Sequence, residues 1–235
     1  MKVPKVSLTM TLVAVVGYFT QPFYFPGPPS ADFAVLGEDD LPMLRAVLEK
    51  YDGKFGADLP AYLNHCLRTA SFAEHFLRER GLSAEAIEGK RRILGAALAY
   101  HDAGLWTDGA LSYLDVSAQR ARRDLAETFT ESEVTAVEAI ITQHHKVTEV
   151  VTKGDADDAK GDDDLVDAVR KADWLDFTQN AGLPLRSGMP SGNIALANAK
   201  LPKLGFIWIL AKMPYNLRPD DPLRGHLEIM QIFKW

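Results

Sequence analysis

The sequence contains very little cysteine. Cys66 is the one cysteine among 235 residues. This excludes an intramolecular disulfide framework and any zinc site built from several thiolates. Histidine and carboxylate side chains are then the remaining ligands for a transition metal. The chain has six histidines, and these are the first residues to consider as parts of a functional site.

Positive charge is also scarce. Lys and Arg total 26 against 32 Asp and Glu, which gives a formal net charge of −6. Proteins that bind nucleic-acid backbones are usually basic, so we expect a small-molecule partner and no nucleic-acid polymer. Hydrophobic residues make up 47% of the chain, which is enough for a folded core. The length favours one main domain.

Charge is missing altogether near the N-terminus. No charged residue lies between Lys5 and Asp32, and residues 6–25 are mostly apolar. A helix of about 20 residues can span a bilayer core. Three interpretations stay open: a membrane anchor, an arm packed on the domain, or a cleaved signal peptide. The length favours anchoring or export over a cytoplasmic location. If the segment spans a membrane, the lysines before it and the acids after it place the globular part on the non-cytoplasmic side.

Signals for β-strands are almost absent, and helical periodicity dominates from residue 40 onward. Helix boundaries follow from start and stop residues, such as Asp58 with Pro60 and the capping pair Thr130 and Glu133. We predict helices over residues 40–51, 58–80, 83–104, 117–128, 130–145 and 164–180, with an acidic loop at 153–164.

These elements predict an all-α fold. We divide the chain into a hydrophobic N-terminal segment over residues 1–30, a helical domain over 31–190, and a C-terminal helical extension over 191–235 that packs on the domain. The extension contains one apolar run, residues 206–211, which is too short to cross a membrane.

Four polar residues occupy positions where apolar side chains are expected. His65 shares a helix face with Phe72, so its side chain should point inward. His101 and Asp102 follow an apolar helix just where it meets a glycine. Asp173 lies among apolar residues, where a carboxylate is costly unless it is paired or binds a metal. These residues are therefore candidates for a common site.

The sequence around them reads Asn64-His65-Cys66-Leu67-Arg68, then Tyr100-His101-Asp102-Ala103-Gly104-Leu105-Trp106, then Ala172-Asp173-Trp174-Leu175-Asp176. In this order and spacing it resembles the HD-domain superfamily of metal-dependent phosphohydrolases. The resemblance extends over residues 40–182. It implies a helical bundle with a metal site between its helices, in which His65, His101, Asp102 and Asp173 bind one divalent ion.

Two imidazoles and two carboxylates suit Mn, Fe, Co, Ni or Zn, whereas Mg prefers oxygen ligands. A bound ion would lower the pKa of a water molecule and polarise a phosphoryl oxygen. We therefore expect metal-dependent hydrolysis of a small phosphate ester or nucleotide, an anionic substrate, with Asp102 at the reacting centre.

Neighbouring residues extend the candidate site. His144 and His145 resemble the histidine pair of superfamily members with a second metal ion, and they also suit acid/base catalysis or phosphate binding. Lys146 is a candidate for catalysis or for contact with the substrate anion, or else it caps a helix. Two interpretations of Arg68 stay open: it binds a phosphate of the substrate, or it is solvated on its helix. Asp176 likewise either supports a metal ligand by a hydrogen bond or lies at the surface.

Four other residues have simpler interpretations. Trp106 and Trp174 can line a pocket, but core packing is favoured for both. His75 points to a different side of its helix from His65, and His226 lies in the Pro-rich C-terminal part; we expect both to be structural or exposed.

Other functions are compatible with the same candidate site residues. The HD fold also hosts hydration of small nitrile-like molecules and di-iron oxygenation, and Asn64-His65 with Arg68 is similar to a cyanamide hydratase. A membrane-tethered module that binds a ligand without turnover is the alternative from another class. An ordered set of metal ligands favours an enzyme, because a binding module has less need of an open coordination position.

Overall fold

The computed structural model describes residues 27–148, 157–179 and 187–233. This part of the chain is helical and contains no β-strand, so the all-α prediction is confirmed for it. Its α-helices are α2 (Pro42–Phe55), α3 (Leu59–Glu79), α4 (Ala84–Tyr100), α5 (Gly104–Thr107), α6 (Tyr113–Leu125), α7 (Glu131–Gln143), α8 (Asp157–Thr178), α9 (Ser191–Lys200), α10 (Phe206–Leu217) and α11 (Pro222–Ile229), with short 3-10 turns η1 (Glu38–Asp40), η2 (Gly56–Asp58) and η3 (Met230–Ile232).

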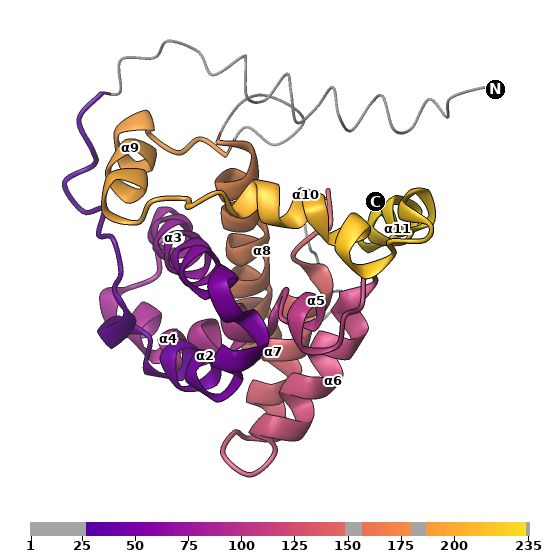
Figure 1. Cartoon of the computed structure of the whole chain (residues 1–235). Coiled ribbons are helices and arrows are strands. Elements are labelled where there is room, and N and C mark those ends of the chain that lie inside the picture. Colours follow the sequence, from indigo (N-terminus) through magenta and orange to yellow (C-terminus); the bar gives the residue numbers. More distant parts are fainter. Residues whose placement is uncertain (1–26, 149–156, 180–186, 234–235) are drawn as a thin grey trace.

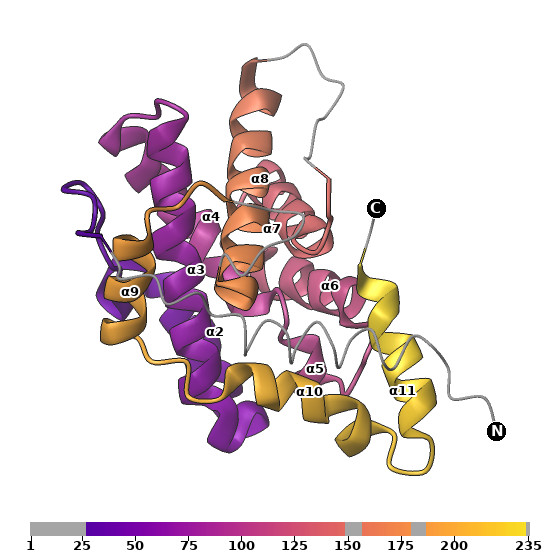
Figure 2. The same ribbon diagram turned by 90° about the horizontal axis from the view of Figure 1, so that it is seen from above.

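Helix α3 lies at the centre of the bundle and packs most extensively against α8 (Figure 1). Helix α2 packs on α4, and α6 packs on α7. The C-terminal helices α10 and α11 pack against each other along one side of the bundle (Figure 2). The two helices with the most extensive mutual contact, α3 and α8, also carry four of the candidate site residues: His65 and Arg68 on α3, and Asp173 and Asp176 on α8.

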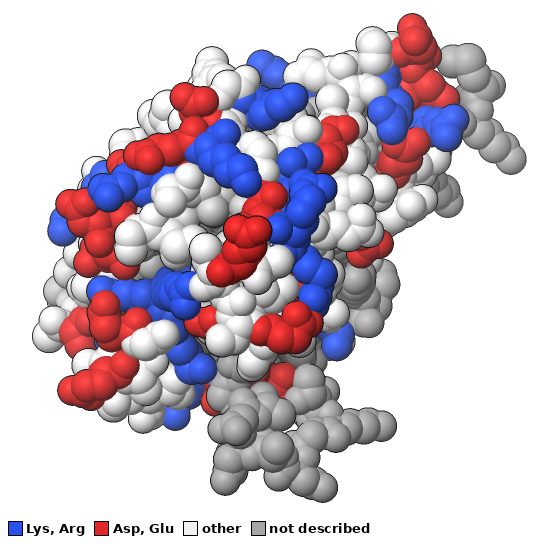
Figure 3. Space-filling view, turned by 90° about the horizontal axis from the view of Figure 1, so that it is seen from below, with Lys and Arg blue, Asp and Glu red and all other residues white. Residues whose placement is uncertain are grey.

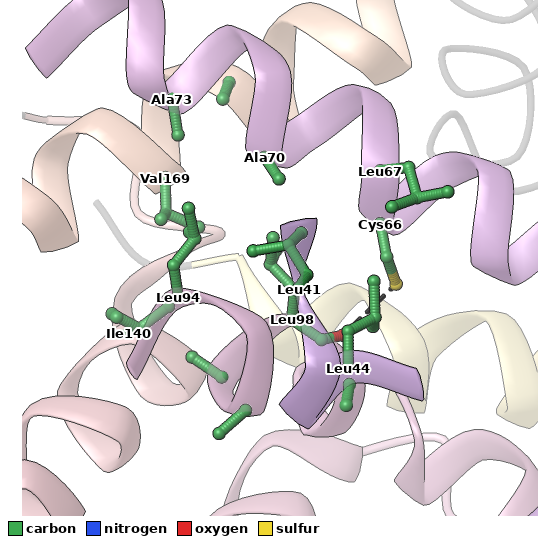
Figure 4. Packing of buried hydrophobic residues seen from close by; sticks show 14 of the residues in the cluster. Leu41, Leu44, Cys66, Leu67, Ala70, Ala73, Leu94, Leu98, Ile140 and Val169 are labelled. Atoms are coloured by element: carbon green, nitrogen blue, oxygen red, sulfur yellow. Dashed lines mark hydrogen bonds between the residues drawn. The ribbon is translucent and has the colours of Figure 1, made fainter. Parts of the chain in front are cut away.

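The core forms where these helices meet. Figure 4 shows Leu44 of α2, Ala70 of α3, Leu98 of α4 and Val169 of α8 packed together, and none of these side chains is more than 1% exposed. The small side chains of α3 allow neighbouring helices to approach closely. The Cys66 thiol is buried here as well and donates to the Leu98 carbonyl at 3.2 Å. Helix α3 is therefore buried along most of its length.

Several helix boundaries differ from those predicted. Helix α2 continues to Phe55 instead of ending at residue 51, because the Phe55 ring is buried and stacks on Tyr62 at 4.9 Å. Gly56, with φ of +54°, then ends the helix. Helix α6 begins at Tyr113 and not at residue 117, since Tyr113 is itself buried in the core.

The predicted loop at 153–164 is wrong from residue 157 onward. Helix α8 begins at Asp157, within the acidic run. The sequence of this stretch lacks the apolar periodicity that would reveal a helix. The predicted helix 83–104 is also interrupted: α4 ends at Tyr100, and the chain turns at His101 before the short helix α5.

The helix-start signals have mixed outcomes. Thr130 and Glu133 form the predicted capping box at the start of α7. Asp58 occupies the N-cap position of α3, but its side chain makes no capping bond and accepts a hydrogen bond from the Trp106 indole at 3.0 Å instead.

The predictions for the hydrophobic N-terminus fall on residues 1–26, outside the described residues. Gly27 and Ser30 donate from their backbone nitrogens to Ser191 and Asn193 of α9. Within the described ranges, no helix is both long and apolar enough to cross a membrane. Acidic and basic side chains are interspersed on the face seen in Figure 3, and surface ion pairs such as Arg122 with Glu138 are one consequence of this mixed charge.

Candidate metal centre

The four residues singled out first in the sequence meet in space. His65 comes from the middle of α3, His101 and Asp102 from the turn after α4, and Asp173 from α8. None of these four residues is more than 4% exposed. The break after Tyr100 matters here, because the turn directs two adjacent side chains toward one point.

Three of the distances between donor atoms fall in the range expected for ligands of one ion, whereas the Asp102 oxygen lies 4.0 Å from Nε2 of His65 and the Asp173 oxygen 3.8 Å from Nε2 of His101. Nε2 of His65 lies 3.0 Å from Nε2 of His101 and 3.3 Å from an Asp173 oxygen, and Nε2 of His101 lies 3.4 Å from an Asp102 oxygen. Donor atoms that bind one ion at about 2.1 Å, with angles between right and tetrahedral, lie about 3.0–3.4 Å apart. His65, His101 and Asp102 thus form a buried group that can hold a metal ion.

Hydrogen bonds orient the imidazoles for this role. Nδ1 of His101 lies 2.7 Å from the Leu98 carbonyl and Nδ1 of His144 lies 2.8 Å from the Ile141 carbonyl. A carbonyl only accepts, so each Nδ1 carries the hydrogen and each Nε2 presents a lone pair. Nδ1 of His65 likewise donates to Asp176 at 2.8 Å. The ring nitrogens that face the cluster are therefore the ones free to bind a cation.

Two buried polar atoms in the cluster lack any hydrogen-bond partner in the structure: Oδ1 of Asp102 and Nε2 of His144. They lie 3.3 Å apart. Unpaired buried polar atoms are costly, and a cation between them removes the cost. Asp102, His144 and His145 form a second group able to hold a metal ion, and this group shares Asp102 with the first.

The electrostatics of the cluster favour a positive ion. Burial raises the pKa of Asp102, but the neighbouring His101 and His144 rings outweigh it and hold the pKa well below its usual range. Burial lowers the pKa of His101 to about 4, so this ring is neutral. Burial also lowers the pKa of His65, yet its hydrogen bonds to Asp173 and Asp176 prevail and raise it to about 9. Without a metal ion, a proton on His65 thus supplies positive charge to the cluster. A bound metal ion would displace this proton and supply the positive charge instead.

Asp176 and Arg68 are buried partners of each other. Arg68 donates to the two Asp176 oxygens at 2.6 and 2.8 Å, and neither residue is more than 1% exposed. The surface interpretations of both residues are therefore wrong. Lys203 donates to the Asp176 backbone carbonyl at 2.5 Å. Burial raises the pKa of Asp176, but Arg68 outweighs burial and holds this pKa far below its usual range.

A cavity of about 770 Å³ opens directly onto the cluster. His65, Asp102, His145 and Asp173 line its inner end, and α10 and α11 supply much of its wall. The candidate centre is thus reachable by a molecule of drug-like size, since such pockets usually measure about 300–1,000 Å³.

Sequence reasoning missed three residues at this inner end. The Tyr113 hydroxyl lies 2.7 Å from Nε2 of His145. The Phe206 ring stacks on His65 at 4.2 Å, and Phe233 lies 5.3 Å from His145. Phe206 is the first residue of the apolar run 206–211, and this run is a sequence signal for burial. Tyr113 and Phe233 belong to no recognisable motif.

The remaining candidates are divided between the cavity and its surroundings. Trp106 packs against the core, as predicted. Trp174 and His226 line the cavity, so the core position favoured for Trp174 is wrong. His75 is 4% exposed and packs edge-on against Phe33, in agreement with a structural role. Lys146 does not line the cavity, and its backbone carbonyl accepts a hydrogen bond from Arg170.

No family model matches the chain, and neither a curated protein nor a solved structure matches it significantly. Its class therefore rests on the fold and the site. The described part of the chain is all-helical, with a buried group of histidine and aspartate side chains that can hold a metal ion between its helices.

Proposed function

We propose that this chain is a metal-dependent hydrolase of the HD type that cleaves a phosphate ester. The observation that carries the proposal is the buried group of His65, His101 and Asp102 at a cavity that His65 and Asp102 line. An Asp173 oxygen lies 3.3 Å from Nε2 of His65. A divalent transition ion held by His65, His101, Asp102 and Asp173 would polarise a phosphoryl oxygen and lower the pKa of water. A structural cluster satisfied by hydrogen bonds would not leave Asp102 and His144 with unpaired buried atoms.

The surrounding residues have separate tasks in this proposal. Asp176 accepts the Nδ1 hydrogen of His65 and holds the ring with Nε2 toward the ion. His145 is the most accessible imidazole of the cluster, with 14% of its side chain exposed, and it lines the cavity. We assign it the transfer of a proton to the leaving group, with the Tyr113 hydroxyl fixing its orientation. Phe206 covers His65 and keeps water from the inner side.

Metal binding is tested on the full chain after removal of metal with a chelator. Zn²⁺ and Mn²⁺ are titrated while thermal unfolding is followed. An ion at a hundred times its Kd should stabilise the fold by about 2.7 kcal/mol. Asp102→Asn should abolish most of this gain. Asp124→Asn is the matched control, because Asp124 is 9% exposed and hydrogen-bonded but contacts Tyr51, Tyr100 and Lys50 instead of the cluster. A wild-type chain that binds no transition ion would disprove the proposal.

Activity is measured with p-nitrophenyl phosphate on the metal-loaded chain. We expect hydrolysis that depends on the ion, persists in Asp124→Asn and disappears in Asp102→Asn. Metal content per chain, measured in wild type, His144→Ala and His145→Ala, tests the second group. Loss of one ion per chain in both variants would support a two-metal centre, and an unchanged ratio would assign this histidine pair to proton transfer.

Hydration of a small uncharged molecule is a second candidate, by similarity to cyanamide hydratase. One observation favours it: Arg68 and Lys203, two cations of the cavity lining, are both bound to Asp176. An uncharged head group does not require either of them as a counter-ion. Turnover of cyanamide without turnover of any phosphate ester would select this reaction. We further propose a small-molecule partner, no nucleic-acid polymer, and membrane association through residues 6–25. Fractionation of membranes from cells expressing the full chain tests the last point.

A further inference from the structure

The cavity beyond the metal cluster has two chemically different ends. The inner end carries the imidazoles and carboxylates of the cluster. The wall beyond it is formed by apolar side chains of α8, α10, α11 and the C-terminal turn, among them Trp174, Leu210, Leu227, Ile229 and Met230. A molecule that reaches the cluster therefore places the rest of its body against hydrocarbon.

The cationic side chains of this cavity are unsuited to a polyphosphate. The Arg68 side chain is fully buried, and each of its three nitrogens already donates a hydrogen bond, two to Asp176 and one to the Leu201 carbonyl. The Lys203 ammonium donates to the Asp176 carbonyl, and burial lowers its pKa. Lys212, the other lysine of the lining, is exposed on α10. A chain of phosphates would thus have its charges facing apolar side chains at a large desolvation cost.

The apolar lining continues outward to the solvent. Trp208, Tyr215, Leu223 and Leu227 all line the cavity, yet each is about half exposed. Large apolar side chains that stay exposed around a pocket usually mark a binding surface. Because this surface is continuous with the metal cluster, its occupant is a molecule whose other end lies at the cluster.

We infer that the substrate has an extended, uncharged hydrocarbon body and one small polar head group, and that nucleotides are not substrates. This inference rests on the proposed function and names the substrate class of that site. For a phosphate monoester of an apolar alcohol, water supplies a hydroxyl group to phosphorus as the ester P–O bond breaks. The proton released from that water goes to the alcohol oxygen, and the products are inorganic phosphate and the alcohol. The head group would lie at the candidate metal-binding residues, and the hydrocarbon lies along α10 and α11.

The test is a homologous series of alkyl phosphates, from butyl to decyl, used below their micelle concentrations. Binding to the full metal-loaded chain is measured by calorimetry, with adenosine monophosphate as the polar comparison. Each methylene group that enters the apolar part should tighten binding about threefold to fourfold. Octyl phosphate should bind at least tenfold more tightly than adenosine monophosphate. Equal affinities along the series, or tighter binding of the nucleotide, would overturn the inference.

Two variants locate the hydrocarbon. Leu227→Glu places a charge on the cavity wall, where Leu227 is 50% exposed, and should weaken octyl phosphate at least tenfold while changing butyl phosphate little. Leu204→Glu is the matched control, because Leu204 is 56% exposed and does not line the cavity; its affinities should stay at the wild-type values. Equal weakening in both variants would contradict the assigned position. The wild-type series decides the inference even if a variant fails to fold.

The outcomes separate this inference from the proposed function. Chain-length-dependent binding without hydrolysis would support the substrate class and contradict the hydrolase. Hydrolysis of p-nitrophenyl phosphate without any dependence on chain length would support the hydrolase and overturn the substrate class. Metal-free protein should retain the gain in binding affinity with each methylene group, because that gain arises in the apolar part of the cavity and not at the ion.

Discussion

Replacing Asp176 by asparagine is the most informative single perturbation of the candidate centre. The Asp176 carboxylate accepts three hydrogen bonds: one from Nδ1 of His65 at 2.8 Å and two from Arg68 at 2.6 and 2.8 Å. An amide keeps one acceptor oxygen and turns an NH₂ group toward these donors. Asp176→Asn therefore leaves the buried Arg68 guanidinium without its counter-ion and removes the orienting partner of His65.

Two separate losses follow. Breaking a buried ion pair from one side costs about 3–5 kcal/mol of stability. Losing the hydrogen bond behind a metal-binding histidine lowers metal affinity about 10–100-fold. The double variant Arg68→Met with Asp176→Leu removes both buried charges, so it should recover part of the stability. Its metal affinity should stay low, because His65 Nδ1 still lacks an acceptor.

Urea unfolding of the metal-free chain measures the first loss, and competition against a chromophoric chelator measures the second. Glu74→Gln is the control: Glu74 lies on α3 with His65, is fully buried, and pairs with Arg78 and Arg91. It should lower stability and leave metal affinity unchanged. An Asp176→Asn protein with wild-type stability, or one whose metal affinity changes no more than that of Glu74→Gln, would refute the reasoning.

Three further predictions concern stability. Gly104→Ala should destabilise the protein by about 1–3 kcal/mol through overpacking, because an added Cβ would lie 2.9 Å from Val116; an unchanged urea midpoint would contradict this packing. Thr130→Ala removes the N-cap of α7 and should cost about 1 kcal/mol in thermal unfolding, with no loss if the cap bond is unimportant. Burial raises the pKa of Asp167, but the hydrogen bond from Arg170 outweighs it and lowers the pKa. Asp167 thus stabilises the fold above its unfolded pKa of about 3.9 and loses this contribution as the pH falls through its lower folded pKa. Asp167→Asn should flatten the acid limb of a stability-against-pH curve; an equally steep limb would assign acid unfolding to other carboxylates.

Local sequence signals predicted the helices well where apolar periodicity and caps coincide. The segment around His65 is an example, because its apolar positions repeat at helical spacing and Gly81, with φ of +86°, ends the turn after α3. The proximity of His65, His101, Asp102 and Asp173 was predicted from the resemblance in motif order and spacing, because the burial argument shows only that each polar residue requires a partner and not which one. Boundaries failed where tertiary contacts decide, as at Phe55, whose burial against Tyr62 extends α2.

The pairing of Arg68 with Asp176 could not be read from the sequence. The two residues lie 108 positions apart, and each has a surface alternative that local spacing does not exclude. The cavity wall was also hidden, because it is assembled from α10 and α11, whose sequences carry no motif. The Arg68–Asp176 pair and the cavity wall both depend on contacts between residues far apart in the chain. Local patterns in a single sequence do not specify such contacts.

The difference in burial between α3 and α11 implies that the two helices open at different rates. Residues of α3 from Ala61 to Leu77 are almost all buried, whereas α11 buries only Gly225. Amide hydrogens of α3 should therefore exchange with solvent only when the whole fold opens, and those of α11 through local opening. His65 is held on the most persistent helix of the bundle, and the apolar wall is built from a more labile one. A ligand of the proposed site would thus enter and leave by displacing the wall while the candidate metal-binding residues keep their geometry.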